Sequence, residues 1–122
     1  MKKLLSIILA FIFPFCYMFG ETKKATDSLL SLGYEYYSQE RYMDALDVLS
    51  KAVKAADKTH DDYTYIKSYV YIGNIYTIFD DYEQALHYYK KSLEKAYELK
   101  DKEAITTAKC NMLLCYANLG MA

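Results

Sequence analysis

The sequence contains no tryptophan, a single proline and only four glycines in its 122 residues. The proline is Pro14, so no later residue breaks a helix by removing a backbone N–H donor. The four glycines lie far apart, which excludes the glycine-rich loop that cradles phosphate groups. Residues 21–122 are therefore compatible with long helices, and nothing in them indicates a nucleotide site.

Neither sign of charge dominates the chain. The 15 basic residues include Lys2 and Lys3, so residues 21–122 carry 13 basic and 16 acidic side chains, a formal net charge of −3. The two signs are interspersed and form no basic stripe of the kind that binds nucleic acid. We therefore expect no nucleic-acid partner.

The residues that commonly carry catalysis or bind metals are few and poorly grouped. His60 lies in a charged linker and His87 on a polar helix face, and neither has a serine or cysteine nucleophile at a suggestive spacing. The pairs Asp61-Asp62 and Asp80-Asp81 lack the pattern of a calcium loop and are better explained as helix caps. We expect a protein that is not an enzyme and has no cofactor and no metal site.

The first twenty residues differ from the rest. Two lysines precede an apolar run from Leu4 to Phe19, which ends at the polar stretch ETKKATD. This order is typical of a cleaved secretory signal. The run falls slightly short of the roughly 20 residues that span a bilayer, so an uncleaved anchor is one alternative and a lipoprotein acylated at Cys16 is another. All three predict an exported protein, periplasmic or associated with the cell envelope, that meets a membrane only through this segment.

The remainder of the chain repeats itself at an offset of forty residues. The stretch ERYMDALDVL at 40–49 returns as DDYEQALHYY at 80–89. Before each stretch, apolar residues and a glycine recur at the i, i+3, i+4, i+7 spacing of one helical face. The matching pairs are Leu29 and Tyr69, Leu32 and Ile72, Gly33 and Gly73, and Tyr36 and Tyr76. A further shift of forty begins a third copy at Met112 and Tyr116.

This pattern predicts an all-α chain of antiparallel helix pairs, with helices at about 24–39, 42–58, 62–78, 82–100 and 102–119. Aspartates stand where caps are needed. Asp80 is expected to cap the fourth helix, with Glu83 completing a capping box, whereas Asp61 or Asp62 caps the third and Asp101 the fifth.

The register also assigns core positions. Glycine inside a helix costs about 1 kcal/mol relative to alanine, so Gly33 and Gly73 need a packing reason. We expect it to be the close approach of the paired helix at Ala45 or Ala85. Tyrosines at core positions are Tyr36, Tyr76, Tyr89 and Tyr116. Cys110 and Cys115 are expected to be small core residues without a disulfide, because five positions apart they occupy different helix faces.

At these residues the sequence resembles the tetratricopeptide repeat family. The resemblance is carried by Leu29-x2-Leu32-Gly33-x2-Tyr36 followed by Ala45-x3-Leu49-x2-Ala52, and by the same pattern forty residues later. It implies a right-handed α-solenoid over residues 21–122, with repeats near 26–61 and 66–101 and a partial one at 106–122. The offset exceeds the usual 34 residues or so and resembles the longer-repeat subclass of bacterial sensors and kinesin-light-chain-like arrays.

The third copy is incomplete. Lys109 and Leu113 replace the large residue and the glycine of the other copies, and CNMLLCYANL is apolar on most sides. An exposed apolar patch of this kind marks an interface or a truncation. We therefore predict either self-association through the last helix or origin as a fragment of a longer array, such as an envelope sensor or regulator.

The chain is rich in tyrosine, with 15 residues, 14 of them after the leader. In the resembled family, the first helix of each pair lines a concave groove, and the resemblance places six side chains there: Tyr34, Tyr37, Lys67, Tyr71, Asn74 and Asn111. Tyrosine is favoured at interfaces because it offers a large contact area at low entropic cost. The expected function is a non-enzymatic scaffold that binds a protein or peptide segment. The alternative is an envelope assembly scaffold tethered through Cys16 or an uncleaved anchor.

Overall fold

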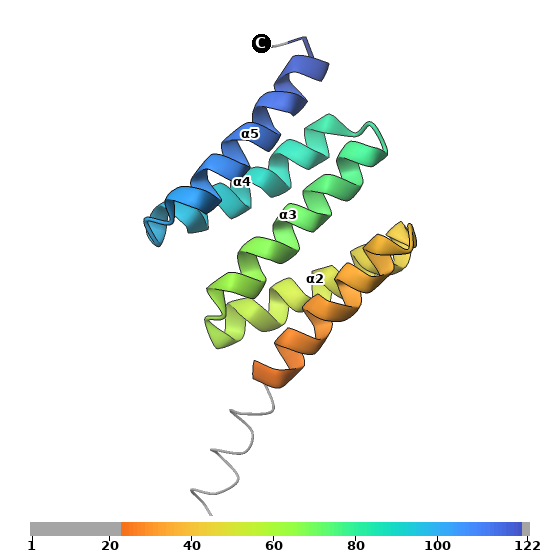
Figure 1. Ribbon diagram of the computed structural model, residues 1–122, viewed down its shortest axis with the longest axis vertical. Coiled ribbons are helices and arrows are strands. Elements are labelled where there is room, and N and C mark those ends of the chain that lie inside the picture. The colour runs from red at the N-terminus through yellow and green to blue at the C-terminus, as the bar shows by residue number, and fades with distance from the viewer. Residues whose placement is uncertain (1–22, 121–122) are drawn as a thin grey trace, which may run out of the picture.

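The computed structural model describes residues 23–120, and these form five consecutive helices (Figure 1). The first spans residues 23–38. It is followed by α2 (Tyr42–Thr59), α3 (Asp62–Ile78), α4 (Tyr82–Glu98) and α5 (Lys102–Asn118). These bounds agree with the predicted helices to within two residues. The predictions about the leader and Cys16 concern residues outside those that the structure describes.

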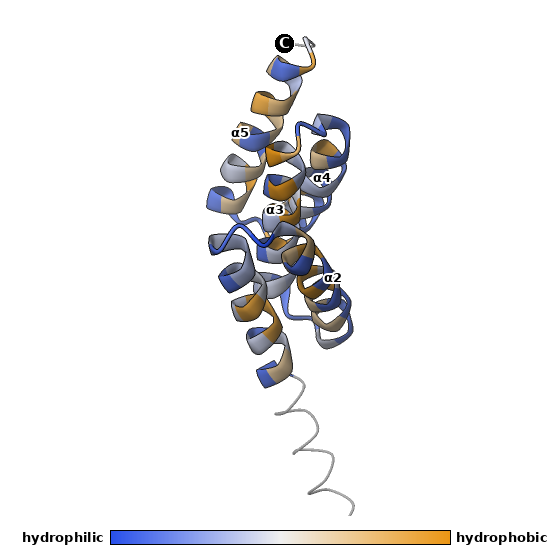
Figure 2. Cartoon of the chain, turned by 90° about the vertical axis from the view of Figure 1, so that its right-hand side faces the viewer, coloured by the Kyte–Doolittle hydropathy of each residue, from blue (hydrophilic) through white to orange (hydrophobic). Residues whose placement is uncertain are grey.

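Each described helix packs against the next one along the chain. The pairs α2 and α3, α3 and α4, and α4 and α5 are in contact, and α3 also touches α5. Within this set of helices, α2 and α4 make no contact with each other. Figure 2 accordingly shows α2 and α4 along one side of the molecule and α5 along the other. This alternation is that of an α-solenoid, as predicted. None of the described helices is both long and apolar enough to cross a bilayer.

Four of the connecting turns are built in the same way. Each turn between two helices contains one residue with a left-handed backbone, namely Glu40, His60, Asp80 or Lys100, whose φ angles are 55 to 59°. The following residue donates its N–H to the carbonyl five positions back, for example Asp81 to Tyr76 at 2.9 Å. This is the Schellman arrangement, usually completed by glycine. Here the turn holds four non-glycine residues in a backbone region that L-residues disfavour.

The caps follow from these turns. Asp61 and Asp101 accept the N–H groups of Thr64 and Ala104, which confirms two predicted caps. The prediction for α4 was wrong: Asp81, not Asp80, accepts from the N–H of Gln84. Asp80 is the left-handed residue that ends the previous turn, so its backbone cannot also begin the helix. The predicted capping box of Asp80 with Glu83 was therefore wrong as well.

The helical glycines admit the close approach of the paired helix, as predicted, but the nearest side chains are not those of the predicted alanines. A Cβ atom on Gly33 would lie 2.5 Å from Cδ2 of Leu49, and one on Gly73 would lie 2.5 Å from Cε1 of Tyr89. Leu49 and Tyr89 each sit one helical turn after the predicted alanine. Side chains on a helix lean toward its N-terminus, so a residue one turn later covers the glycine.

The buried side chains form two clusters. One centres on Leu49, Val53, Ile72 and Ile75. The other centres on Leu86, Tyr89 and Cys115. Tyr89 is fully buried and Tyr36, Tyr76 and Tyr116 are half-buried, with Tyr36 and Tyr76 packed on the first cluster and Tyr76 and Tyr116 on the second, as the register predicted.

The two described cysteines are free, and they differ. Cys115 is buried in the second cluster, as expected. Cys110 is exposed, so its assignment to the core was wrong. The reason is that the face of α5 carrying Cys110 has no helix packed on it among residues 23–120, whereas the face carrying Cys115 is covered by α4.

Candidate functional site

Tyr34, Tyr37 and Tyr71 meet where the helix at 23–38 packs against α3, and we call these three residues the tyrosine cluster. The ring centre of Tyr71 lies 5.6 Å from that of Tyr34 and 5.3 Å from that of Tyr37, with the planes tilted by 54° and 49°. Tyr34 is half exposed, whereas Tyr37 and Tyr71 are partly covered. The i, i+3 spacing of Tyr34 and Tyr37 puts both on one helix face. The structure therefore brings together three of the six predicted groove residues.

The aromatic contacts continue beyond the tyrosine cluster. The ring of Tyr37 lies 6.0 Å from that of Tyr42, which in turn meets Phe79 edge-on at 5.8 Å. Phe79 is 45% exposed. A continuous row of rings thus runs from the helix pair to the turn after α3.

The protonation of Tyr71 follows from this packing. Burial raises the pKa of Tyr71 above its usual range, and three neighbouring phenols raise it further: those of Tyr34, Tyr63 and Tyr37. The phenol of Tyr71 therefore stays protonated, as a hydrogen-bond donor, at ordinary pH. Tyr63, Lys67 and Tyr71 follow one another at intervals of four residues and so share one face of α3.

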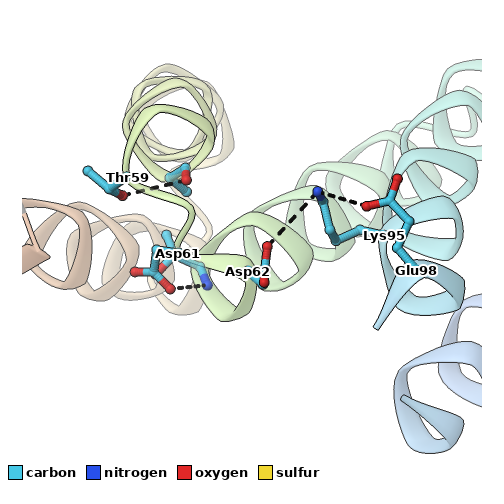
Figure 3. A network of polar contacts seen from close by, with 7 residues as sticks. Thr59, Asp61, Asp62, Lys95 and Glu98 are labelled. Atoms are coloured by element: carbon cyan, nitrogen blue, oxygen red, sulfur yellow. Dashed lines mark hydrogen bonds and ion pairs between the residues drawn. The ribbon is translucent and has the colours of Figure 1, made fainter. Parts of the chain in front are cut away.

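At the other end of this first junction, between the helix at 23–38 and α3, three polar side chains meet. The hydroxyl of Thr26, which is fully buried, lies 2.9 Å from Oδ2 of Asp61, and the hydroxyl of Thr64 donates to the same oxygen at 2.7 Å. Burial alone would raise the pKa of Asp61, but the hydrogen bonds from Thr64 and Thr26 and the nearby charge of Lys23 hold it below its usual range. Figure 3 shows Asp61 in this turn, ahead of α3.

The next residue, Asp62 at the start of α3, interacts with α4 instead. Lys95 lies 4.0 Å from Asp62 and 3.1 Å from Glu98, the chain of contacts drawn in Figure 3. Its ammonium group also stands 5.1 Å from the ring centre of Tyr65. Asp61 and Asp62 are thus both engaged within the fold, one as a cap and one with a lysine.

A cleft of about 340 Å³ opens at the second junction, between α3 and α5. The wall formed by α3 is apolar apart from Lys67, and the other wall carries two acidic groups. Its lining consists of Tyr63, Ile66, Lys67, Val70, Leu99, Asp101, Glu103, Ala104 and Thr107. The ammonium group of Lys67 lies 5.8 Å from the ring centre of Tyr63. The predicted groove residue Lys67 therefore belongs to this cleft and not to the tyrosine cluster.

The two amides have different positions. Asn74 accepts a 2.6 Å hydrogen bond from the buried hydroxyl of Tyr89 through its Oδ1, so this oxygen holds the core rather than facing a partner. Asn111 lies on α5 beside Thr107 and Cys110, along a shallow hollow. The predicted set of six thus divides into the tyrosine cluster, the cleft, an internal hydrogen bond and the surface of α5.

Sequence reasoning missed most of the cleft. Tyr63 and Ile66 stand at i and i+3, a spacing that places them on one face of α3. The offset of forty residues makes Glu103 the equivalent of Tyr63 on α5, so both residues line the cleft between these two helices. This spacing is a signal in the sequence that could have found them.

The predicted apolar patch is present on α5. Leu113 is 64% exposed and Leu114 is 58% exposed. Leu113 stands at the position of Gly73, where the glycine of α3 admits Tyr89. A helix lying on α5 as α4 lies on α3 would meet the side chain of Leu113.

Comparison with known proteins agrees with this architecture. The family model described as "Tetratricopeptide repeat" matches residues 19–98, more than half of the chain. Among solved structures, the crystal structure of the TPR domain of Arabidopsis FLU superposes with a TM-score of 0.76 at 21% identity, covering 82% of this chain and 84% of that one. At this identity the likeness concerns the fold alone. No curated protein matches the chain. From the family model and the repeated helix pairs together, the chain belongs to the tetratricopeptide repeat family.

Proposed function

We propose that this protein is a non-enzymatic scaffold that binds a peptide or protein segment along the face formed by the helix at 23–38, α3 and α5. The tetratricopeptide repeat fold itself suggests protein–protein interaction. The observation that carries the finer proposal is that the tyrosine cluster and the cleft share one face of α3, through Tyr71 in the cluster and Tyr63 in the cleft. Together they provide a continuous surface of aromatic and apolar groups with a polar rim, which suits peptide recognition.

A peptide-display selection on purified residues 21–122, which carry both core clusters, tests this proposal. Peptides selected on the protein should lose binding when Tyr34, Tyr37 and Tyr71 are replaced together by alanine. Tyr97→Ala is the matched control, because Tyr97 is an equally exposed tyrosine on α4. Circular dichroism should show unchanged helicity in both variants. Binding that survives the triple replacement would exclude the tyrosine cluster as the site.

A second candidate function is self-association through α5. Leu113 and Leu114 are exposed side by side, and between Ala104 and Gly120 the only charged residue is Lys109. An apolar face with a single charged residue can pair with its own copy with little like-charge repulsion. Light scattering on residues 21–122 should show a dimer that Leu113→Gln with Leu114→Gln dissociates, whereas Met43→Gln, at another exposed apolar side chain, leaves it intact. A monomer at high micromolar concentration would contradict this.

We also propose that the protein is exported and acts in the periplasm or cell envelope, as a part of a larger regulator or, alternatively, as a tethered assembly scaffold. The composition of residues 1–20 supports export, and the forty-residue offset supports the longer-repeat subclass. The mass of the mature protein distinguishes the cases. Cleavage near residue 20, acylation of Cys16 and an intact leader each give a different mass, and a cytosolic, unprocessed chain would exclude export.

A further inference from the structure

The tyrosine cluster combines exposed aromatic surface with phenol groups that the fold does not use. Among the hydrogen bonds of the described residues, Tyr82 donates to Asp80 and Tyr89 to Asn74, but the hydroxyls of Tyr34, Tyr37 and Tyr71 have no partner. No ion pair or cation–π contact of the described residues involves these three rings either. The surface is therefore aromatic, uncharged and able to donate hydrogen bonds.

These properties restrict the ligand. A phosphorylated or acidic segment requires a cluster of arginine or lysine groups, and no cation–π contact of the described residues places such a group over these three rings. An amphipathic helix requires a deep groove for aliphatic anchors, whereas the ring of Tyr71 packs against those of Tyr37 and Tyr34 at 5.3 and 5.6 Å and occupies the space between them. The cluster instead offers a shallow surface of three tilted rings, with phenol hydroxyl groups as hydrogen-bond donors at its edges.

A polyproline II segment has the complementary chemistry. It has no internal hydrogen bonds, so all its carbonyl oxygens remain available as acceptors, and its pyrrolidine rings recur every three residues on one edge, at about 3.1 Å per residue. It is already extended before binding, so little entropy is lost on an open surface. We propose that the tyrosine cluster binds a proline-rich segment in the polyproline II conformation, an inference that rests on the proposed groove function and names its partner class.

The neighbouring cleft sets the length of such a segment. Tyr63 and Tyr71 are eight residues apart on one face of α3, about 12 Å at 1.5 Å per residue, which corresponds to about four residues of polyproline II. A residue about four positions from the prolines on the cluster then reaches the cleft. Ile66, Val70 and Leu99 line it, so a large apolar side chain fits at that position.

The decisive probe is a synthetic decaproline peptide, compared with a Gly-Ser peptide of equal length. Isothermal titration calorimetry measures binding without relying on the tyrosines that the variants remove. Decaproline should bind residues 21–122, and the Gly-Ser peptide should not. Replacing Tyr34, Tyr37 and Tyr71 together by phenylalanine keeps the rings but removes the donors and should weaken binding about five- to tenfold. The corresponding alanine variant should lose it, and Tyr97→Ala should not change it.

Failure of this inference differs from failure of the groove function. If decaproline does not bind while display-selected peptides of other composition bind and depend on the cluster, the polyproline inference is overturned and the groove function stands. If decaproline binds equally well to the alanine variant, the cluster is not its site. If neither decaproline nor any selected peptide depends on the cluster, both proposals fail. Retained helicity by circular dichroism shows that each variant is folded.

Discussion

The first repeat, comprising the helix at 23–38 and α2, and the second, comprising α3 and α4, use the same backbone for different purposes. Where the first has Leu49 in the core, the second has Tyr89. The buried hydroxyl of Tyr89 needs partners, and it lies 2.6 Å from Oδ1 of Asn74 and 3.3 Å from the hydroxyl of Thr77. The positions equivalent to Asn74 and Thr77 in the first repeat are Tyr34 and Tyr37.

This difference teaches how the candidate site arises. Leu49 carries no hydroxyl, so the two positions beside it in the first repeat need not supply hydrogen bonds and can carry side chains for the surface. In the second repeat the same positions are tied to the core. The choice between leucine and tyrosine at this core position therefore decides whether the adjacent groove positions are free to contact a ligand.

The largest effect is expected at the two helical glycines. The Cβ of Gly73→Ala would meet the ring of Tyr89, which is rigid and held by hydrogen bonds, whereas that of Gly33→Ala would meet Leu49, which can rotate away. We expect a loss in the free energy of unfolding of about 2 kcal/mol at Gly73 and about 1 kcal/mol at Gly33. Urea denaturation followed by circular dichroism measures both. Tyr89→Leu should recover part of the loss at Gly73, and equal losses at the two glycines would contradict the contrast.

The caps of α3 and α5 differ in a similar way. Asp61 accepts hydrogen bonds from Thr64 and from Thr26 of the preceding repeat, whereas its equivalent Asp101 accepts from the N–H of Ala104. Asp61→Ala should therefore cost about 2 kcal/mol and Asp101→Ala about 1 kcal/mol, the upper and middle of the range for lost caps.

The pH dependence has a definite sign. The pKa of Asp61 is lowered in the folded protein, so its stabilisation is present above the unfolded value near 4 and is lost as the pH falls through the folded pKa. The difference in unfolding free energy between the wild type and Asp61→Ala should shrink from pH 6 toward pH 3. A difference that is constant over this range would show that the Thr26 and Thr64 contacts do not favour the carboxylate.

A smaller effect is expected at the hydroxyl of Tyr89. Tyr89→Phe keeps the ring but leaves Oδ1 of Asn74 without its donor, so we expect a loss of about 1 kcal/mol. Tyr97→Phe, at an exposed tyrosine on the same helix, should change nothing measurable. Thermal unfolding of both variants provides the comparison. An unchanged Tyr89→Phe would mean that Asn74 is not committed to the core and remains available to a ligand.

Much of this fold could be predicted because the repeat supplies each position twice. Gly33 with Gly73 and Tyr36 with Tyr76 set the helix register, and the aspartates before α3 and α5 identified their starts. The errors were shifts of one residue in the cap of α4 and of one helical turn in the residues that cover the glycines. Asp80 and Asp81 are equally good capping residues, and only the left-handed turn decides between them. Leu49 and Tyr89 cover the glycines because helical side chains lean backward.

The site was less predictable for a different reason. Bulky side chains such as Tyr34, Tyr37 and Tyr71 mark a surface, and the sequence identified them. The cleft arises from small residues: Ala104 stands where the first junction has Thr64, and Thr107 is shorter than Lys67, its equivalent on α3. A pattern of apolar positions predicts which side chains pack in the core, but it does not predict a cleft that short side chains leave between two helices.

The smallest effect concerns the turn that both repeats share. Glu40 and Asp80 both end the first helix of a repeat at a φ of 59°, a left-handed conformation that glycine adopts without strain. Glu40→Gly should raise the free energy of unfolding by about 0.5–1 kcal/mol, because relief of strain exceeds the entropy that glycine adds to the unfolded chain. Asp80→Gly should gain less, since it also removes the acceptor for the hydroxyl of Tyr82, 3.0 Å away. Differential scanning calorimetry resolves the two, and a larger gain at Asp80 would show that the Tyr82 contact contributes nothing to the second repeat.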